Sequence, residues 1–215
     1  MLRVGLTGGI ACGKSAVGRM MAARGAHVID ADKVGHRLLR PGHPVYQQVV
    51  QAFGPSILRE DKTIDRARLA ELAFGDAAAG GGRVPEINRI MHPAIVAYQD
   101  GQLDEIERRD PMGIAVVEAA LMFEAGAAGR FDKVIAVTCG LDQRVARWAE
   151  RQGVDLQTAR AEVERRMAAQ WPDEKKAAAA DYVIENSGSL AETESVVERL
   201  MNDLRVLAAS QPHAT

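Results

Sequence analysis

Residues 8–15, Gly-Gly-Ile-Ala-Cys-Gly-Lys-Ser, constrain the fold more than any other part of the chain, because they fit the phosphate-binding pattern G-x-x-x-x-G-K-[ST]. An apolar run over residues 2–7 precedes the pattern and predicts a buried strand, and apolar side chains at helical spacing over residues 14–24 predict a helix. A strand and a helix joined in this way direct backbone N–H groups and the helix dipole at an anion. The alternative, a glycine-rich turn with an incidental lysine, explains neither the complete motif nor its flanks.

The residues of this loop have separate tasks. Gly8, Gly9 and Gly13 allow the backbone to approach phosphates at distances that a Cβ atom would block. Lys14 is expected to reach the β- and γ-phosphates, and the Ser15 hydroxyl is expected to ligate Mg²⁺. The sequence therefore predicts a site for a nucleoside triphosphate and its metal.

The charge balance and the cysteine count exclude several classes of protein. The 215 residues include 27 basic and 29 acidic side chains, which argues against attraction to nucleic acids or anionic membranes. Cys12 and Cys139 provide neither a disulfide framework nor metal-ligand spacing. No apolar stretch approaches the ~20 residues of a membrane span, and the phosphate loop begins too early for a signal peptide. We expect a cytoplasmic protein with no nucleic-acid or membrane partner.

Four further segments read as strands, namely residues 27–30, 113–118, 133–137 and 182–185. They are short, apolar and rich in β-branched residues, and helical patterns separate them, which is typical of a parallel sheet covered on both faces. With the first strand they predict an α/β fold with a five-stranded parallel sheet flanked by helices.

Two blocks without strands divide this predicted core. Residues 31–111 read as successive helices punctuated by residues 41–44, 53–55 and 92–93, with an alanine- and glycine-rich connection at 77–82, and residues 141–180 read as a charged helical hairpin broken near Gly153. The core then comprises residues 1–30, 112–140 and 181–208. By analogy with nucleoside and nucleotide kinases, one helical insertion would bind the acceptor and the other would close as a lid.

Two aspartates are candidates for a general base. Asp30 ends the second strand and Asp32 follows two residues later, at the sheet edge where α/β proteins bind ligands. A carboxylate there would face both the phosphate loop and an acceptor, and Asp32 is preferred. The alternative is that either residue caps the helix that starts near Lys33.

Arginines could supply positive charge to the transferred group. Arg144, Arg147 and Arg151 are three and four residues apart and share one face of a helix, and Arg165 and Arg166 are weaker candidates. The alternative is an ordinary solvated helix face, since acidic residues lie nearby.

Other candidates stand alone in the sequence. Glu118 ends the third strand, where phosphate-loop enzymes place an acid that holds the metal or its water. His92 precedes a proline and either caps a helix or contacts substrate. Residues 186–188 either line a purine pocket or form a turn.

These residues, in the order in which they follow along the chain, resemble the dephospho-CoA kinase family. Thr-Gly-Gly-Ile at 7–10 joined to Ile-Asp-Ala-Asp at 29–32 is characteristic of that family, whereas the phosphate loop by itself is unspecific. The other matches extend the resemblance to about Leu207 and are Arg40-Pro41-Gly42, Phe53-Gly54, Arg68-Leu69, Met91-His92-Pro93, Leu121-Met122-Phe123-Glu124, residues 143–151, Ala169-Gln170, Lys175 and residues 180–186.

The resemblance implies a P-loop kinase that transfers the γ-phosphoryl group of ATP to the ribose 3′-hydroxyl of dephospho-CoA, the last step of coenzyme A synthesis. It implies that Asp32 is the base, that Lys14 and Arg147 contact phosphates, and that residues 31–111 bind the acceptor, with Arg68 and His92 among the contacts. Mg²⁺ is the implied cofactor, ATP and dephospho-CoA are the implied partners, and a monomer or weak homo-oligomer is expected. The implied ATP-binding residues are Gly8, Gly9, Ala11, Cys12, Gly13, Lys14, Ser15, Ala16 and Asn186.

The chain departs from the family pattern at three places. Ala16 replaces the usual hydroxyl residue after Ser15, which removes one possible phosphate contact. Glu118 replaces an aspartate and lengthens the metal-side carboxylate by one methylene, and Ala119-Ala120 stands where Val-Pro is usual. The loop lysine and Asp32 remain.

Two other functions compete with this interpretation. A nucleoside monophosphate kinase would share the loop and the lid and differ in the acceptor region. A GTP-binding switch protein is suggested by the D-x-x-G pattern at residues 32–35, but the chain has no N-K-x-D guanine motif, and the pattern begins only 17 positions after Ser15, which leaves little room for an ordered switch segment.

Overall fold

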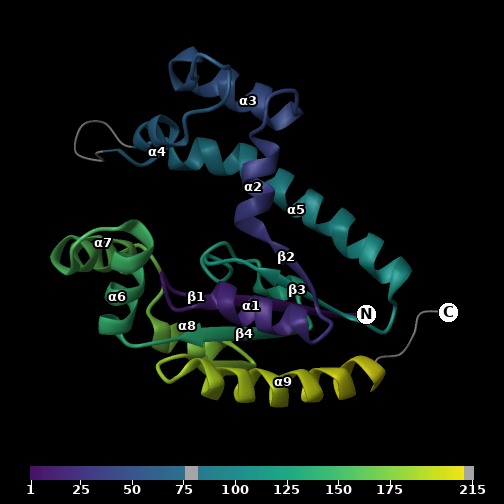
Figure 1. Cartoon of the computed structure of the whole chain (residues 1–215). Coiled ribbons are helices and arrows are strands. Elements are labelled where there is room, and N and C mark those ends of the chain that lie inside the picture. Colours follow the sequence, from purple (N-terminus) through teal and green to yellow (C-terminus); the bar gives the residue numbers. More distant parts are fainter. Residues whose placement is uncertain (76–81, 211–215) are drawn as a thin grey trace. The chain divides into compact units, whose positions relative to one another are not determined.

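The computed structural model describes residues 1–75 and 82–210, and the chain divides into two compact units (Figure 1). Residues 1–30 and the chain from Leu103 onward form the first unit, and Ala31–Gln102 forms the second. Most of the connection predicted for residues 77–82 lies outside the described residues.

A five-stranded parallel sheet forms the centre of the first unit and confirms the predicted α/β fold. The order across the sheet is β2-β3-β1-β4-β5, and the three central strands are largely buried, whereas each edge strand has one buried residue, Ile29 in β2 and Ile184 in β5. In the register, Asp30 pairs with Glu118 and Gly8 pairs with Val137, so the carboxyl ends of these strands share one edge. The strands are β1 (Leu2–Gly8), β2 (His27–Asp30), β3 (Ile114–Glu118), β4 (Lys133–Thr138) and β5 (Tyr182–Glu185).

Helices α1 (Lys14–Ala23) and α9 (Leu190–Ser210) pack together against one face of this sheet. Their buried side chains, such as Val17 and Leu204, join those of β1 and β4 in one apolar cluster. A second cluster includes Met122, Phe123 and Val134 and packs against residues next to helix α8 (Asp173–Ala179). The burial of these apolar side chains is the main favourable contribution to the stability of such a domain.

Helices α6 (Leu141–Gln152) and α7 (Leu156–Ala168) form the predicted hairpin, and α6 ends at Gly153 with a φ of 67°. The Asp155 side chain accepts hydrogen bonds from two backbone N–H groups of the first turn of α7 and so caps that helix. A small apolar cluster, Val145, Trp148, Ala149, Ala159 and Val163, holds the hairpin together.

In its described residues the second unit contains α2 (Ala31–Leu38), α3 (Pro44–Phe53), a 3₁₀ turn (Pro55–Ile57), α4 (Arg66–Phe74) and most of α5 (Val84–Arg109), together with one isolated antiparallel bridge between Leu58 and Ile64. The prediction that His92-Pro93 separates two helices is wrong, because both residues lie inside α5. A proline in a helix interior removes one backbone hydrogen bond and costs roughly 3 kcal/mol. We attribute the continuity to the many other turns of this 26-residue helix. Within the described residues, no helix is long and apolar enough to cross a membrane.

Candidate active site

The phosphate loop connects β1 to α1 and depends on glycine at its last turn. Gly13 has a φ of 91°, a conformation that L side chains rarely adopt, and a Cβ atom there would lie 2.0 Å from Nδ2 of Asn186. Ala11 also has a positive φ, of 53°. The loop is therefore a tight turn that requires glycine at its last position.

Side chains from other elements hold the carbonyl groups of this loop on its outer side. Asn186 Nδ2 donates to the carbonyl oxygen of Cys12 at 2.8 Å, and Arg147 Nη1 donates to the same oxygen at 3.3 Å. Arg144 Nη1 donates to the carbonyl oxygen of Ile10 at 3.0 Å. In a trans peptide the C=O and the next N–H point in opposite directions, so the N–H groups of Ala11 and Gly13 face the other way. Such a row of N–H groups before a helix is an anion-binding arrangement.

Lys14 and Ser15, the first two residues of α1, both contact the carboxylate of Glu118. Lys14 Nζ lies 2.8 Å from Glu118 Oε1, and Ser15 Oγ donates to the same oxygen at 2.5 Å. The Glu118 side chain is only 7% exposed, so a charged partner matters there. β1 and β3 bring these residues together by pairing Leu6 with Glu118.

The donor set at this point suits a magnesium ion that also binds phosphates. Mg²⁺ is usually held by one or two protein oxygens, with phosphates and water completing its shell. The Ser15 hydroxyl and the Glu118 carboxylate are hard oxygen ligands of this kind, in contact with each other. Among the described residues there is no group of three or more His, Cys, Asp or Glu side chains that could hold a metal without a substrate.

The three arginines of the predicted lid face have different surroundings. Arg144 is 1% exposed and forms an ion pair with Asp173, and burial raises the pKa of the Asp173 carboxyl against the effect of that arginine. Arg147 is partly exposed and contacts the phosphate loop and the carbonyl oxygen of Asn186. Arg151 is exposed, with its guanidinium 4.6 Å from the centre of the Trp148 ring. Two of the three therefore contact the loop or its support.

Arg165 and Arg166 belong to the surface of α7. Both pair with the carboxylate of Glu162, at 2.8 and 2.6 Å, and these contacts lower the pKa of Glu162 to about 2. The described contacts of these two arginines do not include the phosphate loop.

Asn186 is 5% exposed, and hydrogen bonds hold its side chain at both ends. Nδ2 donates to Cys12, and Oδ1 accepts from the Thr193 hydroxyl at 2.8 Å. The residue therefore links the end of β5 to the phosphate loop and to α9. Contact with a purine base, the role expected from the sequence, stays a prediction.

Cys12 is fully buried inside the loop and packs into the core under the sheet. Burial raises the pKa of its thiol, so the group stays protonated and chemically inert at neutral pH. Burial likewise raises the pKa of Cys139. Both cysteines are free.

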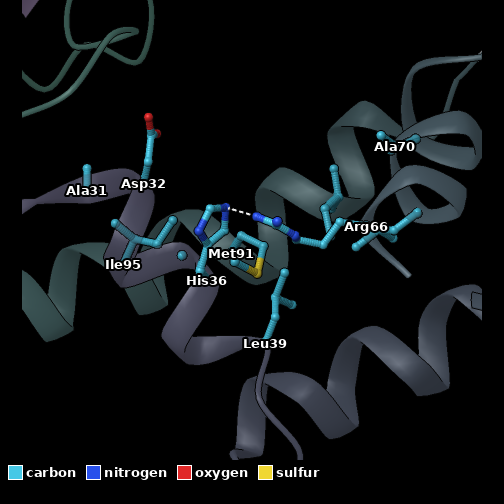
Figure 2. Close-up of a pocket in the computed structure, with 12 residues that line it drawn as sticks. Ala31, Asp32, His36, Leu39, Arg66, Ala70, Met91 and Ile95 are labelled. Atoms are coloured by element: carbon cyan, nitrogen blue, oxygen red, sulfur yellow. Dashed lines mark hydrogen bonds between the residues drawn. The ribbon is translucent and has the colours of Figure 1, made fainter. Parts of the chain in front are cut away.

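The second unit contains a cavity of about 370 Å³ whose polar residues come from α2 and α4 (Figure 2). Asp32 lies in the first turn of α2, His36 lies one turn later, and Figure 2 shows the His36 ring facing the guanidinium of Arg66. Arg66 Nη1 and His36 Nε2 form a hydrogen bond at the polar end of the cavity. The remaining lining is mostly apolar and comprises Ala31, Gly35, Leu39, Leu69, Ala70, Ala73, Ile87, Met91 and Ile95.

Two residues expected in the acceptor region do not line this cavity. Arg68 Nη1 donates to the carbonyl oxygen of Ser56 at 3.1 Å, and His92 is exposed on α5. Their neighbours Arg66 and Met91 line the cavity instead. Helical spacing would have found them, because Arg66 shares a helix face with the buried Leu69 and Ala73, and Met91 shares one with Ile87 and Ile95.

Comparison with known proteins gives a consistent result. A family model described as dephospho-CoA kinase matches residues 2–192. The chain is 38% identical over 212 residues to the dephospho-CoA kinase of Moorella thermoacetica, which covers 99% of this chain and 96% of that relative. It is also similar to the crystal structure of TT1252 from Thermus thermophilus, with a TM-score of 0.77, 30% identity and coverage of 94% and 97%. The dephospho-CoA kinase from Campylobacter jejuni gives a TM-score of 0.66 at 26% identity, with coverage of 95% and 97%.

Proposed function

The chain belongs to the dephospho-CoA kinase family, and from this premise we propose how its residues carry the γ-phosphoryl group of ATP to the ribose 3′-hydroxyl of dephospho-CoA. The protein is an ATP-dependent phosphotransferase for the final step of coenzyme A biosynthesis. The geometry of the phosphate loop is the observation that supports this proposal: side chains hold the Ile10 and Cys12 carbonyls on its outer side, and Lys14 is the first residue of α1.

The triphosphate binds to the backbone N–H groups of the loop and to the N-terminus of α1. Phosphoryl transfer needs aligned phosphates and positive charge more than covalent chemistry from the protein. Ser15, with Glu118 directly or through water, would hold Mg²⁺, and this ion would neutralise charge on the phosphate oxygens. Their contact at 2.5 Å supports this pairing.

Lys14 and Arg147 supply the fixed positive charge. The Lys14 ammonium extends from the first residue of α1 and exchanges its contact with Glu118 for phosphate oxygens. Arg147 uses two N–H groups on Cys12 and Asn186, and a guanidinium carries five, so further donors serve the transferred group. Both charges stabilise the transition state more than the bound substrate.

The acceptor binds in the helical region of residues 31–111, and the cavity beside Asp32 is the part of the described structure that supports this role. Its apolar wall suits an uncharged arm, and the Arg66 guanidinium suits a phosphate group. Arg68 and His92 remain proposed contacts at the margin of this region. The α6–α8 segment, residues 141–180, serves as the lid over ATP.

Asp32 orients the acceptor hydroxyl and takes its proton as transfer proceeds. Its place in the chain supports this role: it follows two residues after Asp30, which pairs in register with Glu118 at the carboxyl edge of the sheet. Asp30 continues the strand and is the carboxylate that we do not assign as base.

We propose in addition that the protein acts in the cytoplasm, where ATP is supplied, as a monomer or weak homo-oligomer. Size-exclusion chromatography with light scattering at several protein concentrations tests the second statement. A stable oligomer that does not dissociate on dilution contradicts it.

The decisive experiment measures ADP release from Mg-ATP with dephospho-CoA, with AMP, with pantetheine and with a dephospho-CoA analogue that lacks the 3′-hydroxyl. We expect turnover with dephospho-CoA alone and a 3′-phosphorylated product by mass spectrometry. Comparable ADP release with AMP would indicate a nucleoside monophosphate kinase. Phosphorylation of the analogue would contradict the 3′-hydroxyl as the acceptor group.

A further inference from the structure

The peptide groups on both sides of Ile10, in the middle of the phosphate loop, are held by side chains from outside the loop. The Ile10 N–H donates to Oε1 of Gln170 at 3.1 Å, and its carbonyl oxygen accepts from Nη1 of Arg144 at 3.0 Å. Gln170 lies between α7 and α8, and Arg144 lies on α6. Two elements distant from the loop in sequence therefore fix the orientation of the peptides on both sides of Ile10.

Arg144 is rigidly anchored where it meets the loop. Its Nε donates to the carbonyl oxygen of Cys139 at 3.0 Å, and Nη2 contacts the Asp173 carboxylate. The guanidinium also fills the space beside Gly9, since a Cβ atom there would lie 2.2 Å from Nη1. An arginine that is 1% exposed, with its donors used in this way, supports the loop from behind and is turned away from solvent.

Gln170 is held in place by its neighbour Trp171. The backbone N–H of Trp171 donates to Oε1 of Glu124 at 2.7 Å, and the Trp171 indole ring stacks on Phe123 with ring centres 5.7 Å apart. Lys176, which is 1% exposed, pairs with the same Glu124 oxygen at 3.0 Å. The Gln170 amide therefore projects from a fixed base toward Ile10.

These contacts act on the loop without using the surface that faces the phosphates. The N–H of Ile10 is taken by Gln170, so this peptide is turned away from the N–H row that begins at Ala11. Release of Gln170 would let the 9–10 peptide rotate and disturb the turn at Ala11, whose φ is positive. Misplacement of a binding group by about 1 Å can cost on the order of 100-fold in rate.

We propose that Gln170, together with the Arg144–Asp173 pair, is a positioning group that sets the geometry of the phosphate loop for phosphoryl transfer. We call these three residues the Ile10 clamp. The inference rests on the proposed function, since it assigns the loop to ATP. The clamp couples the segment between α7 and α8 to the reaction through one peptide and does not touch the substrates.

The test compares three substitutions at one uncharged residue. Gln170→Met keeps the length of the side chain and removes the acceptor, Gln170→Asn withdraws the amide by one methylene, and Gln170→Glu keeps an acceptor at full length. Gln157→Met on the exposed surface of α7 is the matched control. The measurements are kcat at saturating ATP, KM for dephospho-CoA, ADP affinity by titration and the thermal midpoint.

We expect Gln170→Met and Gln170→Asn to lower kcat by about 10- to 100-fold and to weaken ADP binding, with KM for dephospho-CoA unchanged. Gln170→Glu should keep kcat within about threefold of the original protein, because a carboxylate also accepts the Ile10 N–H. A folded Gln170→Met or Gln170→Asn protein with normal kcat and ADP affinity overturns the proposal. Equal impairment of Gln170→Glu and Gln170→Met also overturns it, because the acceptor would then be irrelevant.

ADP affinity separates this inference from the proposed function. If the unmodified protein failed to phosphorylate dephospho-CoA, the acceptor assignment would be wrong, while ADP titration of the variants would still decide the role of the clamp. If the unmodified protein is active and the variants match it in every measurement, the clamp alone is wrong.

Discussion

The Asn186 amide and the Cys12 carbonyl, 174 residues apart in the chain, form a 2.8 Å hydrogen bond that closes the phosphate loop against the end of β5. Thr193 on α9 fixes the other end of the same side chain. One amide thus connects the loop, the sheet edge and the C-terminal helix. The bond is buried, so water does not replace the Asn186 amide as a partner of the Cys12 carbonyl when that amide is removed.

Asn186→Ala should therefore lower the free energy of unfolding by about 1–3 kcal/mol and weaken ADP binding, because the Cys12 carbonyl and the Thr193 hydroxyl both lose this partner. Urea denaturation and ADP titration measure the two effects. Asn202→Ala, at an exposed position of α9, is the control and should change neither quantity appreciably. Unchanged ADP affinity in Asn186→Ala would show that the loop holds its shape without this bond.

Lys14→Ala should reduce kcat by about 10²–10³-fold while the fold is kept, because a charge aimed at the transferred group is lost. Steady-state kinetics with dephospho-CoA measure the effect, and circular dichroism checks the fold. Ser15 retains its contact with Glu118 in this variant, which keeps that carboxylate partly satisfied. Near-normal turnover would mean that Lys14 serves only as the partner of Glu118.

Asp32→Asn should lower kcat by roughly 10²-fold or more with ADP affinity almost unchanged, because an amide keeps the shape but does not accept the proton. Asp30→Asn is the internal control and should be mild, since Asp30 belongs to β2. A large loss of kcat in Asp30→Asn with a small loss in Asp32→Asn would make Asp30 the base in place of Asp32. Two mild variants would leave positioning as the only contribution of this edge.

Glu162 gives a prediction about pH. Its pKa falls from 4.5 to about 2 in the folded protein through Arg165 and Arg166, so its ionised form stabilises the fold above pH 4.5. This contribution is lost as the pH falls from about 4.5 toward 2. Glu162→Gln should lower the free energy of unfolding at pH 7 by less than about 1 kcal/mol, since the pair lies near the surface.

The measurement for Glu162→Gln is urea denaturation at pH 7 and at pH 3, with Glu164→Gln on the same helix as the comparison. The difference from the original protein should shrink at the lower pH. A difference that grows as the pH falls would have the opposite sign from the linkage described here.

The sequence predicted the sheet well because its strands are short apolar runs rich in β-branched residues that alternate with helical patterns, which is typical of a parallel sheet covered by helices. The break predicted at Pro93 was wrong, because the local preference of proline against a helix interior takes no account of the other turns of α5, which continue on both sides of it. Spacing placed Arg144, Arg147 and Arg151 on one helix face, but it does not reveal what stands opposite. Arg144 pairs with Asp173, Arg147 contacts the loop, and Arg151 is exposed and lies over the Trp148 ring.

The polar end of the second unit's cavity was missed for a related reason. His36 and Arg66 are 30 residues apart, and only tertiary packing brings the ring and the guanidinium together. The Ile10 clamp depends on contacts across 134 and 160 residues in the same way. Motifs report the residues next to a ligand, whereas the supporting contacts become visible only in the fold.

The buried thiol of Cys12 makes the phosphate loop its own reporter. Cys12 is fully buried and its pKa is raised, so an alkylating reagent reaches it only in the moments when the loop unfolds locally. The rate of alkylation at Cys12, followed by mass spectrometry, therefore measures how often the loop opens, with no probe added by mutation. A bound nucleotide that stabilises the loop should lower the rate of alkylation at Cys12.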